Sequence, residues 1–247
     1  MKIIFHQDFY QVYTNDPAAE RGRLESIVGE LWDKFDFVDA VPATLEDIAA
    51  VHTPSHIDDV KGEGIYPIAA LAAGGAIQAA QIGLTEPAFA VIRPPGHHAS
   101  AGSAWGFCFF NNMAVAITKL KNEGAIKKAL ILDIDLHFGD GTVNILGSSG
   151  YVDICNPVSQ KSSNYVSEIE QALAGGPYDI IGISAGFDNA LLDWGGVLDR
   201  PDYVEIGCMV RRAAGRTGAG YFAVLEGGYN HKVLGDNALA LLEGMDK

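Results

Sequence analysis

Acidic and imidazole side chains stand directly after apolar runs in this sequence, where they could do metal and acid–base chemistry. Asp133, Asp135 and His137 occupy alternate positions after the apolar residues 129–132. Because side chains alternate along an extended backbone, all three are predicted to point to one side. They could hold one cation, or they could be solvated residues at a strand end before a helix N-cap.

Three further polar clusters follow apolar runs in the same way. They are Asp188 after residues 180–183, His97 and His98 after 89–92, and Tyr229 after 222–225. Singly, each has a plain structural explanation, such as a helix cap, an incidental loop histidine or a packed ring with a hydrated hydroxyl. Ligands of an open parallel sheet, however, bind beyond the carboxyl ends of its strands. Four such ends therefore predict one site, with the residue types of a metal-dependent hydrolase.

Asp135, His137 and Asp188 are the predicted metal ligands. Two carboxylates and one imidazole leave an open coordination position, which a catalytic Zn²⁺ requires. The same donor set suits Fe²⁺, because both ions accept oxygen and imidazole ligands. The sequence therefore predicts one Zn²⁺ or Fe²⁺ per chain.

The adjacent histidines His97 and His98 are the predicted acid–base residues. Asp133 and Asp140 are not needed as metal ligands, and each could hold one imidazole by a hydrogen bond. Such pairs suit proton transfer. Tyr229 follows two glycines at a strand end, where its hydroxyl could donate to an oxyanion.

These side chains need a sheet to position them, and the apolar pattern predicts one. Strands are expected at about 2–6, 36–41, 88–93, 129–135, 151–155, 179–184 and 221–225. Helices are expected at about 17–33, 44–50, 54–60, 66–83, 111–123, 163–174, 202–216 and 232–244. Alternating strands and helices predict an α/β fold of three layers, a mostly parallel central sheet with helices on both faces.

Composition sets the class of protein and its partners. The 247 residues, 48% of them hydrophobic, predict one domain over 1–247. A net charge of −14 argues against a nucleic-acid partner and could attract cationic substrates, although solubility alone would explain it.

Three cysteines without a pairing pattern suit the reducing cytoplasm. The apolar stretch 65–84 contains Gln78 and Gln81, which favours a buried helix over a membrane span.

Together the clusters resemble the zinc-dependent deacetylases of the arginase/deacetylase fold, the family of histone deacetylases and acetylpolyamine amidohydrolases. The matching segments come in the family's order and cover most of the chain: RPPGHHA (93–99), GFCFFNN (106–112), LDIDLHFGDGT (132–142), SAGFD (184–188) and EGGY (226–229). Of these, LDIDLHFGDG is specific by itself.

The resemblance implies a role for each matching residue. Asp135, His137 and Asp188 match the zinc ligands. The other matches are His98 as general base with Asp140 as its partner, His97 as assisting acid or electrostatic stabiliser with Asp133 as its partner, Tyr229 as the transition-state hydroxyl, and Gly106 with Phe107 as one wall of the acyl channel. Family members often also bind K⁺ as a structural ion through carbonyl groups near 133–137.

The departures from the family concern the substrate channel. Only 47 residues separate Asp140 from Asp188, and the part that usually carries an aromatic residue facing Phe107 is missing. The long rim loop also has no counterpart, because only residues 61–64 separate Val60 from Ile65. A shallower, more open site is expected. Trp194 could rebuild a wall, or it could be a packed surface-loop residue, and a partner subunit could replace the lost loops in a homo-oligomer.

The sequence thus predicts a metal-dependent amidohydrolase that removes an acyl group, most simply acetyl, from an amine. Its substrate would be a small molecule or a peptide, such as an acetylpolyamine or acetyl-lysine, with no nucleic-acid or membrane partner. One alternative is an arginase-like binuclear Mn²⁺ ureohydrolase, although that family arranges its carboxylates differently and gives Tyr229 no role. The other is a catalytically silent module that binds acylated ligands.

Overall fold

Strands of one parallel sheet form the centre of this computed structural model, which describes residues 1–246. The sheet order within the described residues is β2-β1-β3-β7-β6-β4-β5, and every pair of neighbours is parallel. The strands are β1 (Lys2–Phe5), β2 (Asp36–Asp39), β3 (Ala88–Ala90), β4 (Ala129–Asp133), β5 (Val152–Cys155), β6 (Ile180–Ala185) and β7 (Gly220–Leu225). The predicted parallel sheet is confirmed.

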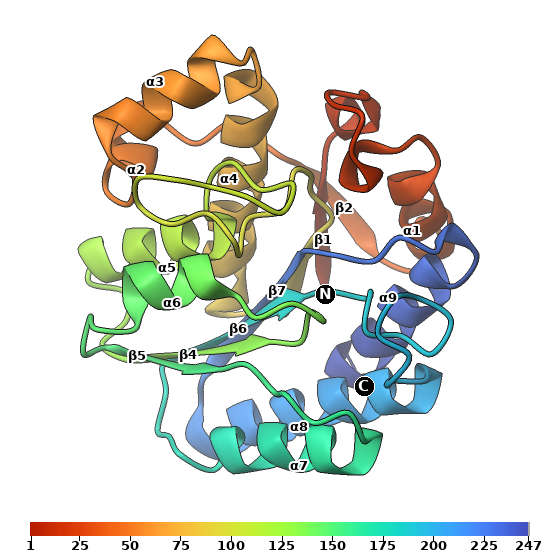
Figure 1. Cartoon of the computed structure of the whole chain (residues 1–247). Helices are drawn as coiled ribbons and strands as arrows, with labels where there is room; N and C mark the ends of the chain where they lie inside the picture. The colour runs from red at the N-terminus through yellow and green to blue at the C-terminus, as the bar shows by residue number, and fades with distance from the viewer. Residues whose placement is uncertain (247) are drawn as a thin grey trace.

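Helices cover both faces of the sheet (Figure 1). They are α1 (Arg23–Leu31), α2 (Leu45–Ala49), α3 (Pro54–Gly62), α4 (Tyr66–Gly83), α5 (Asn112–Asn122), α6 (Asp140–Leu146), α7 (Ser162–Leu173), α8 (Arg200–Thr217) and α9 (His231–Asp246). Helices α4, α5 and α6 lie over one face, and α7, α8 and α9 lie over the other. This arrangement confirms the predicted three layers.

The strand order explains why distant polar clusters meet. Strands β3, β7, β6 and β4 are consecutive neighbours, and they are the four strands that polar clusters were predicted to follow. Their registers align the strand ends, with Ala90 beside Val224, Ala185 beside Leu225 and Asp133 beside Ser184. Every residue of β4 and β6 is buried, as is usual for parallel strands covered on both faces. The clusters therefore lie along one edge of the sheet.

Helix α4 follows the predicted bounds, and its small residues allow close packing. A Cβ atom at Gly74 would lie 1.9 Å from the carbonyl oxygen of Val41, so only glycine fits this contact. Most residues of α4 are buried against the core. Within the described part of the chain, no helix is both long enough and apolar enough to cross a membrane.

The structure differs from several of the expected elements. The helix expected at 17–33 is a 3₁₀ turn (Pro17–Ala19) followed by α1, because Gly22 takes the left-handed conformation (φ 91°) between them. Strand β3 ends at Ala90, three residues earlier than expected. Strand β4 ends at Asp133. Helix α6 was not predicted, because seven residues with little apolar periodicity give a weak sequence signal.

Candidate metal and acid–base site

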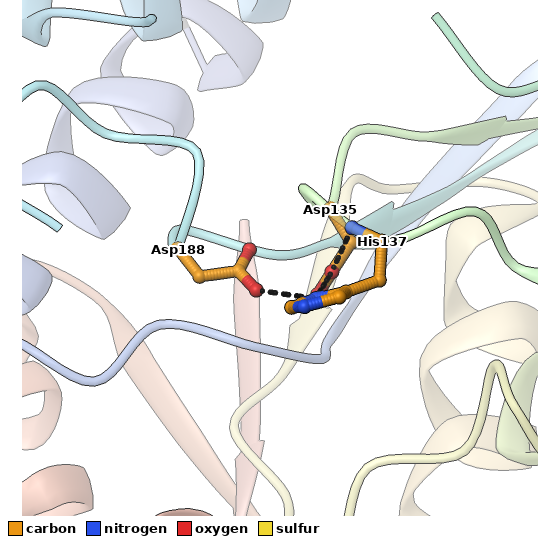
Figure 2. A group of neighbouring side chains, drawn as sticks. All are labelled: Asp135, His137 and Asp188. Atoms are coloured by element: carbon orange, nitrogen blue, oxygen red, sulfur yellow. Dashed lines mark hydrogen bonds and ion pairs between the residues drawn. The ribbon is translucent and has the colours of Figure 1, made fainter. Parts of the chain in front are cut away.

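Asp135, His137 and Asp188 come together beyond the ends of β4 and β6, as Figure 2 shows. One ligand atom from each lies within 4.8 Å of those of the other two. The His137 Nδ1 atom is 3.2 Å from Asp135 Oδ1 and 3.0 Å from Asp188 Oδ2. One imidazole nitrogen and two carboxylate oxygens thus converge on one point, from two neighbouring strands.

Backbone amides orient the two carboxylates of this group. Asp135 Oδ2 accepts from the Gly227 amide at 2.8 Å, and Asp188 Oδ1 accepts from the Leu136 amide at 3.0 Å. Within residues 1–246, the buried Asp188 Oδ2 has no hydrogen bond of normal geometry. Burial and the nearby charge of Asp135 raise the pKa of Asp188 to about 7. An unsatisfied carboxylate oxygen beside a second carboxylate fits a bound cation, and the half-exposed His137 leaves one side open.

Asp133 does not join this group, which corrects the expectation that it points the same way as Asp135 and His137. The chain bends after β4, because Asp133 Oδ1 accepts from the Asp135 amide at 3.3 Å and Asp135 Oδ1 accepts from the His137 amide at 2.9 Å. Asp133 Oδ2 instead lies 3.0 Å from Nδ1 of His97. Burial disfavours a charged imidazole, but the charges of Asp133 and Asp135 outweigh it and raise the pKa of His97 well above its usual value.

His98 forms a second pair, with Asp140 at the start of α6. Its Nδ1 is 2.7 Å from Asp140 Oδ1, and the second carboxylate oxygen accepts from the indole nitrogen of Trp105 at 3.0 Å. The Trp105 ring also lies against His98, with centroids 3.9 Å apart. Burial and the charge of neighbouring His97 lower the pKa of His98 to about 4. The pKa values of the adjacent histidines are therefore shifted in opposite directions, upward for His97 and downward for His98.

Tyr229 lies at the end of β7 among aromatic rings. It stacks on Trp194 at 4.1 Å between centroids and meets Phe107 edge-on at 5.9 Å. The Asp193 carboxylate accepts from the Tyr229 amide at 2.7 Å and holds this turn in place. Burial raises the pKa of Tyr229, although Arg23 opposes it, so the hydroxyl keeps its proton and can donate.

These side chains line one cavity of about 130 Å³. The two histidines, His137 and Tyr229 share it with Gly106 and a set of aromatic residues: Trp105, Phe107 and Trp194. A side chain on Gly106 could not fit, because a Cβ atom there would lie 2.4 Å from the His98 ring. The structure thus places all predicted ligands, histidines, channel residues and Tyr229 at or beside one cavity. Trp194 also lines this cavity, and it remains 54% exposed to solvent.

Sequence reasoning missed three residues that support the site. Trp105 directly precedes the family-like segment 106–112 and gave no other signal. Glu226 is fully buried, and its Oε2 accepts from the amides of Gly96 at 2.7 Å and His97 at 3.2 Å. Arg23 is also fully buried and donates to the carbonyl oxygen of Gly228 at 2.7 Å. A charged Glu at the end of an apolar strand was a usable signal for Glu226, since such groups are rarely buried without partners.

Comparison with known proteins identifies the group to which this site belongs. The histone deacetylase domain family matches residues 61–165. A probable deacetylase of Archaeoglobus fulgidus is 35% identical over 58% of this chain and 47% of its own length. A probable deacetylase of Methanothermobacter thermautotrophicus is 28% identical over 99% of this chain and 90% of its own length. A histone deacetylase-like amidohydrolase of Pseudomonas aeruginosa is 29% identical over 94% of this chain and 76% of its own.

The fold gives the same result. The crystal structure of the HDA15 HD domain superposes with a TM-score of 0.84 at 25% identity, covering 99% of this chain and 88% of that one. The fold and these matches define a histone deacetylase-like protein. This chain belongs to the arginase/deacetylase superfamily. The activity that the family and the relatives' names support is hydrolysis of an amide bond.

Proposed function

We propose that this protein is a metal-dependent amidohydrolase that removes an acyl group, most simply acetyl, from an amine. One observation carries the proposal: two adjacent histidines, each paired with its own aspartate and with pKa values shifted in opposite directions, face the same cavity as the predicted metal ligand His137. A free imidazole and an imidazolium side by side are the base and the acid that amide hydrolysis needs. Acetyl-lysine in a peptide and an acetylpolyamine are the proposed substrate classes.

The proposed metal is Zn²⁺ or Fe²⁺, held by Asp135, His137 and Asp188. When bound, such an ion polarises the substrate carbonyl and activates a water molecule. Within the described residues these three form the only group of this kind, which favours one ion over the two of an arginase-like enzyme. We also propose a structural K⁺ near residues 133–137, on the family resemblance alone.

The protein's own residues supply the proton transfers. Asp140 holds Nδ1 of His98, which leaves Nε2 free to accept a proton from the attacking water. His97 is held as an imidazolium by Asp133, so its charge stabilises the developing negative charge and its proton is available to the departing amine. Tyr229 keeps its hydroxyl proton and donates to the oxyanion.

A Tyr229→Phe variant tests this proposal, because it removes one hydroxyl and little packing. An oxyanion donor contributes roughly 10²–10³ in turnover, so kcat should fall by that factor on a responsive substrate. Deacylation of acetyl-lysine peptides and acetylpolyamines by zinc-loaded protein is the assay. Tyr151→Phe, at the far end of the sheet before β5, is the matched control. Unchanged kcat in Tyr229→Phe would refute the assigned role, and no hydrolysis of any acyl amide would refute the enzyme.

A further inference from the structure

Trp194 lies in the loop that joins β6 to α8, a few residues after the proposed metal ligand Asp188. Its ring is half-exposed, yet it stacks on Tyr229 with 4.1 Å between the centroids and 24° between the ring planes. The same ring lies at a right angle to that of His137, with centroids 6.1 Å apart. One loop tryptophan therefore packs beside both the proposed oxyanion donor and a proposed metal ligand.

A single carboxylate fixes the backbone of both members of this ring pair. Asp193 Oδ1 accepts from the Trp194 amide at 2.9 Å. Asp193 Oδ2 accepts from the amides of Tyr229 and Asn230, each at 2.7 Å. Because both oxygens of one side chain are used, the Trp194 loop and the Tyr229 turn are held in one relative position. The stacking of the two rings is thus supported by hydrogen bonds beneath it.

The direction of the Tyr229 ring depends on its neighbours, because two glycines precede it. The second of them, Gly228, has a φ of 115°, and glycine has more backbone freedom than other residues. Three side chains contact the ring. Phe107 meets it edge-on at 5.9 Å, and the guanidinium carbon of Arg23 lies 5.5 Å from its centroid. Trp194 is the nearest of the three, and its ring is the one stacked on that of Tyr229.

We propose that Trp194 is a positioning residue for the reaction, because its stacked ring holds the Tyr229 hydroxyl in the direction that donates to the oxyanion. This inference rests on the proposed amide hydrolysis, in which Tyr229 is the donor. An oxyanion donor accelerates the reaction only when it is already aimed at the developing charge. A looser ring should therefore lower kcat and leave KM nearly unchanged, whereas loss of a wall that only contacts the substrate would raise KM.

Kinetics of two Trp194 variants with zinc-loaded protein test this role. Trp194→Leu keeps an apolar side chain but removes the aromatic face, so kcat should fall about 3- to 10-fold, the scale of one aromatic pair. Trp194→Phe keeps a ring that can stack and should restore most of this loss. In a Tyr229→Phe background, Trp194→Leu should change kcat less than about twofold, because no hydroxyl remains to be positioned.

A measurement without substrate tests the ring contact separately from the enzyme. In protein labelled with 3-fluorotyrosine, the fluorine NMR resonance of Tyr229 is assigned by its loss in Tyr229→Phe. Trp194→Leu removes the indole beside this ring and should shift the resonance, while Trp32→Leu should not. Trp32 is the matched control, because it is also exposed, packs on Phe37 with centroids 4.8 Å apart, and does not line the catalytic cavity. Urea unfolding verifies that the variants are folded.

Four results would each overturn the positioning role: an unchanged kcat in Trp194→Leu, a rise in KM alone, an equal fall of kcat in the Tyr229→Phe background, or an unmoved Tyr229 resonance. Failure of the proposed function gives a different result, because the native protein would then hydrolyse no acyl amide. A shifted resonance in such a protein would leave Trp194 as a support of the Tyr229 ring without a role in catalysis.

Discussion

Trp105 gives the sharpest test of how the site controls His98. We predict that Trp105→Phe lowers kcat/KM about fivefold while the protein remains folded. The phenyl ring keeps much of the contact with His98, whose ring centroid is 3.9 Å from that of Trp105. The lost group is the indole N–H that donates to Asp140 Oδ2 at 3.0 Å. Asp140 then holds His98 with one oxygen while the other is fixed only by solvent.

The size of the effect follows from exposure. A buried hydrogen bond to a charged group contributes about 1.5–3 kcal/mol. The Asp140 side chain is 36% exposed and Trp105 is 56% exposed, so water replaces much of the lost interaction. We therefore expect the lost hydrogen bond to raise the activation free energy by about 1 kcal/mol, which corresponds to roughly a fivefold fall in kcat/KM.

A second substitution at the same position separates burial from hydrogen bonding. Trp105→Ala uncovers His98, and burial is the main cause that lowers the pKa of His98 to about 4. With less burial this pKa should rise toward its ordinary 6.5. The acidic limb of the profile of kcat/KM against pH should therefore move to higher pH. The assay is a pH profile of both variants, with imidazole resonances followed by NMR.

Trp32→Phe is the control, because Trp32 is 60% exposed at the end of α1 and does not line the catalytic cavity. Native kcat/KM in Trp105→Phe, or an unmoved pH limb in Trp105→Ala, would refute this account of His98.

Three further predictions concern other residues. His98→Ala should lower turnover on the order of 10²-fold or more in metal-loaded protein, and near-normal turnover would remove it as the base. Asp188→Ala should abolish binding of the single metal ion, measured by metal analysis after dialysis, and retained metal would exclude Asp188 as a ligand. Glu226→Ala should lower the free energy of unfolding in urea by about 2–4 kcal/mol, because the Gly96 and His97 amides lose their acceptor. Glu226→Gln should lower it less, since the glutamine keeps an oxygen that can accept from these amides. Equal losses of stability in the two variants would contradict the role given to Glu226.

His98 also contributes to the pH dependence of stability. Its pKa in the folded protein is about 4, below the ordinary 6.5, so the unfolded chain binds more protons between these values. This residue therefore makes the free energy of unfolding rise with pH from about 4 to about 6.5.

Much of the site could be predicted because its determinants are local in sequence. Each polar cluster directly follows its own apolar run, as Asp188 follows β6, so the run predicts the strand and the strand end predicts where the cluster lies. The resemblance then supplied a role for each residue. Local signals failed where tertiary hydrogen bonds decide the backbone path, as in the bend that turns Asp133 away from Asp135.

By itself the sequence determined the residue types, the strands and the edge of the sheet where chemistry could occur. Only the tertiary structure placed β3, β7, β6 and β4 side by side, because hydrogen bonds between parallel strands join segments that are distant in the chain. The same long-range packing set Trp105 on His98 and Asp140. Such contacts depend on the relative positions of whole elements, which no local pattern of residues records.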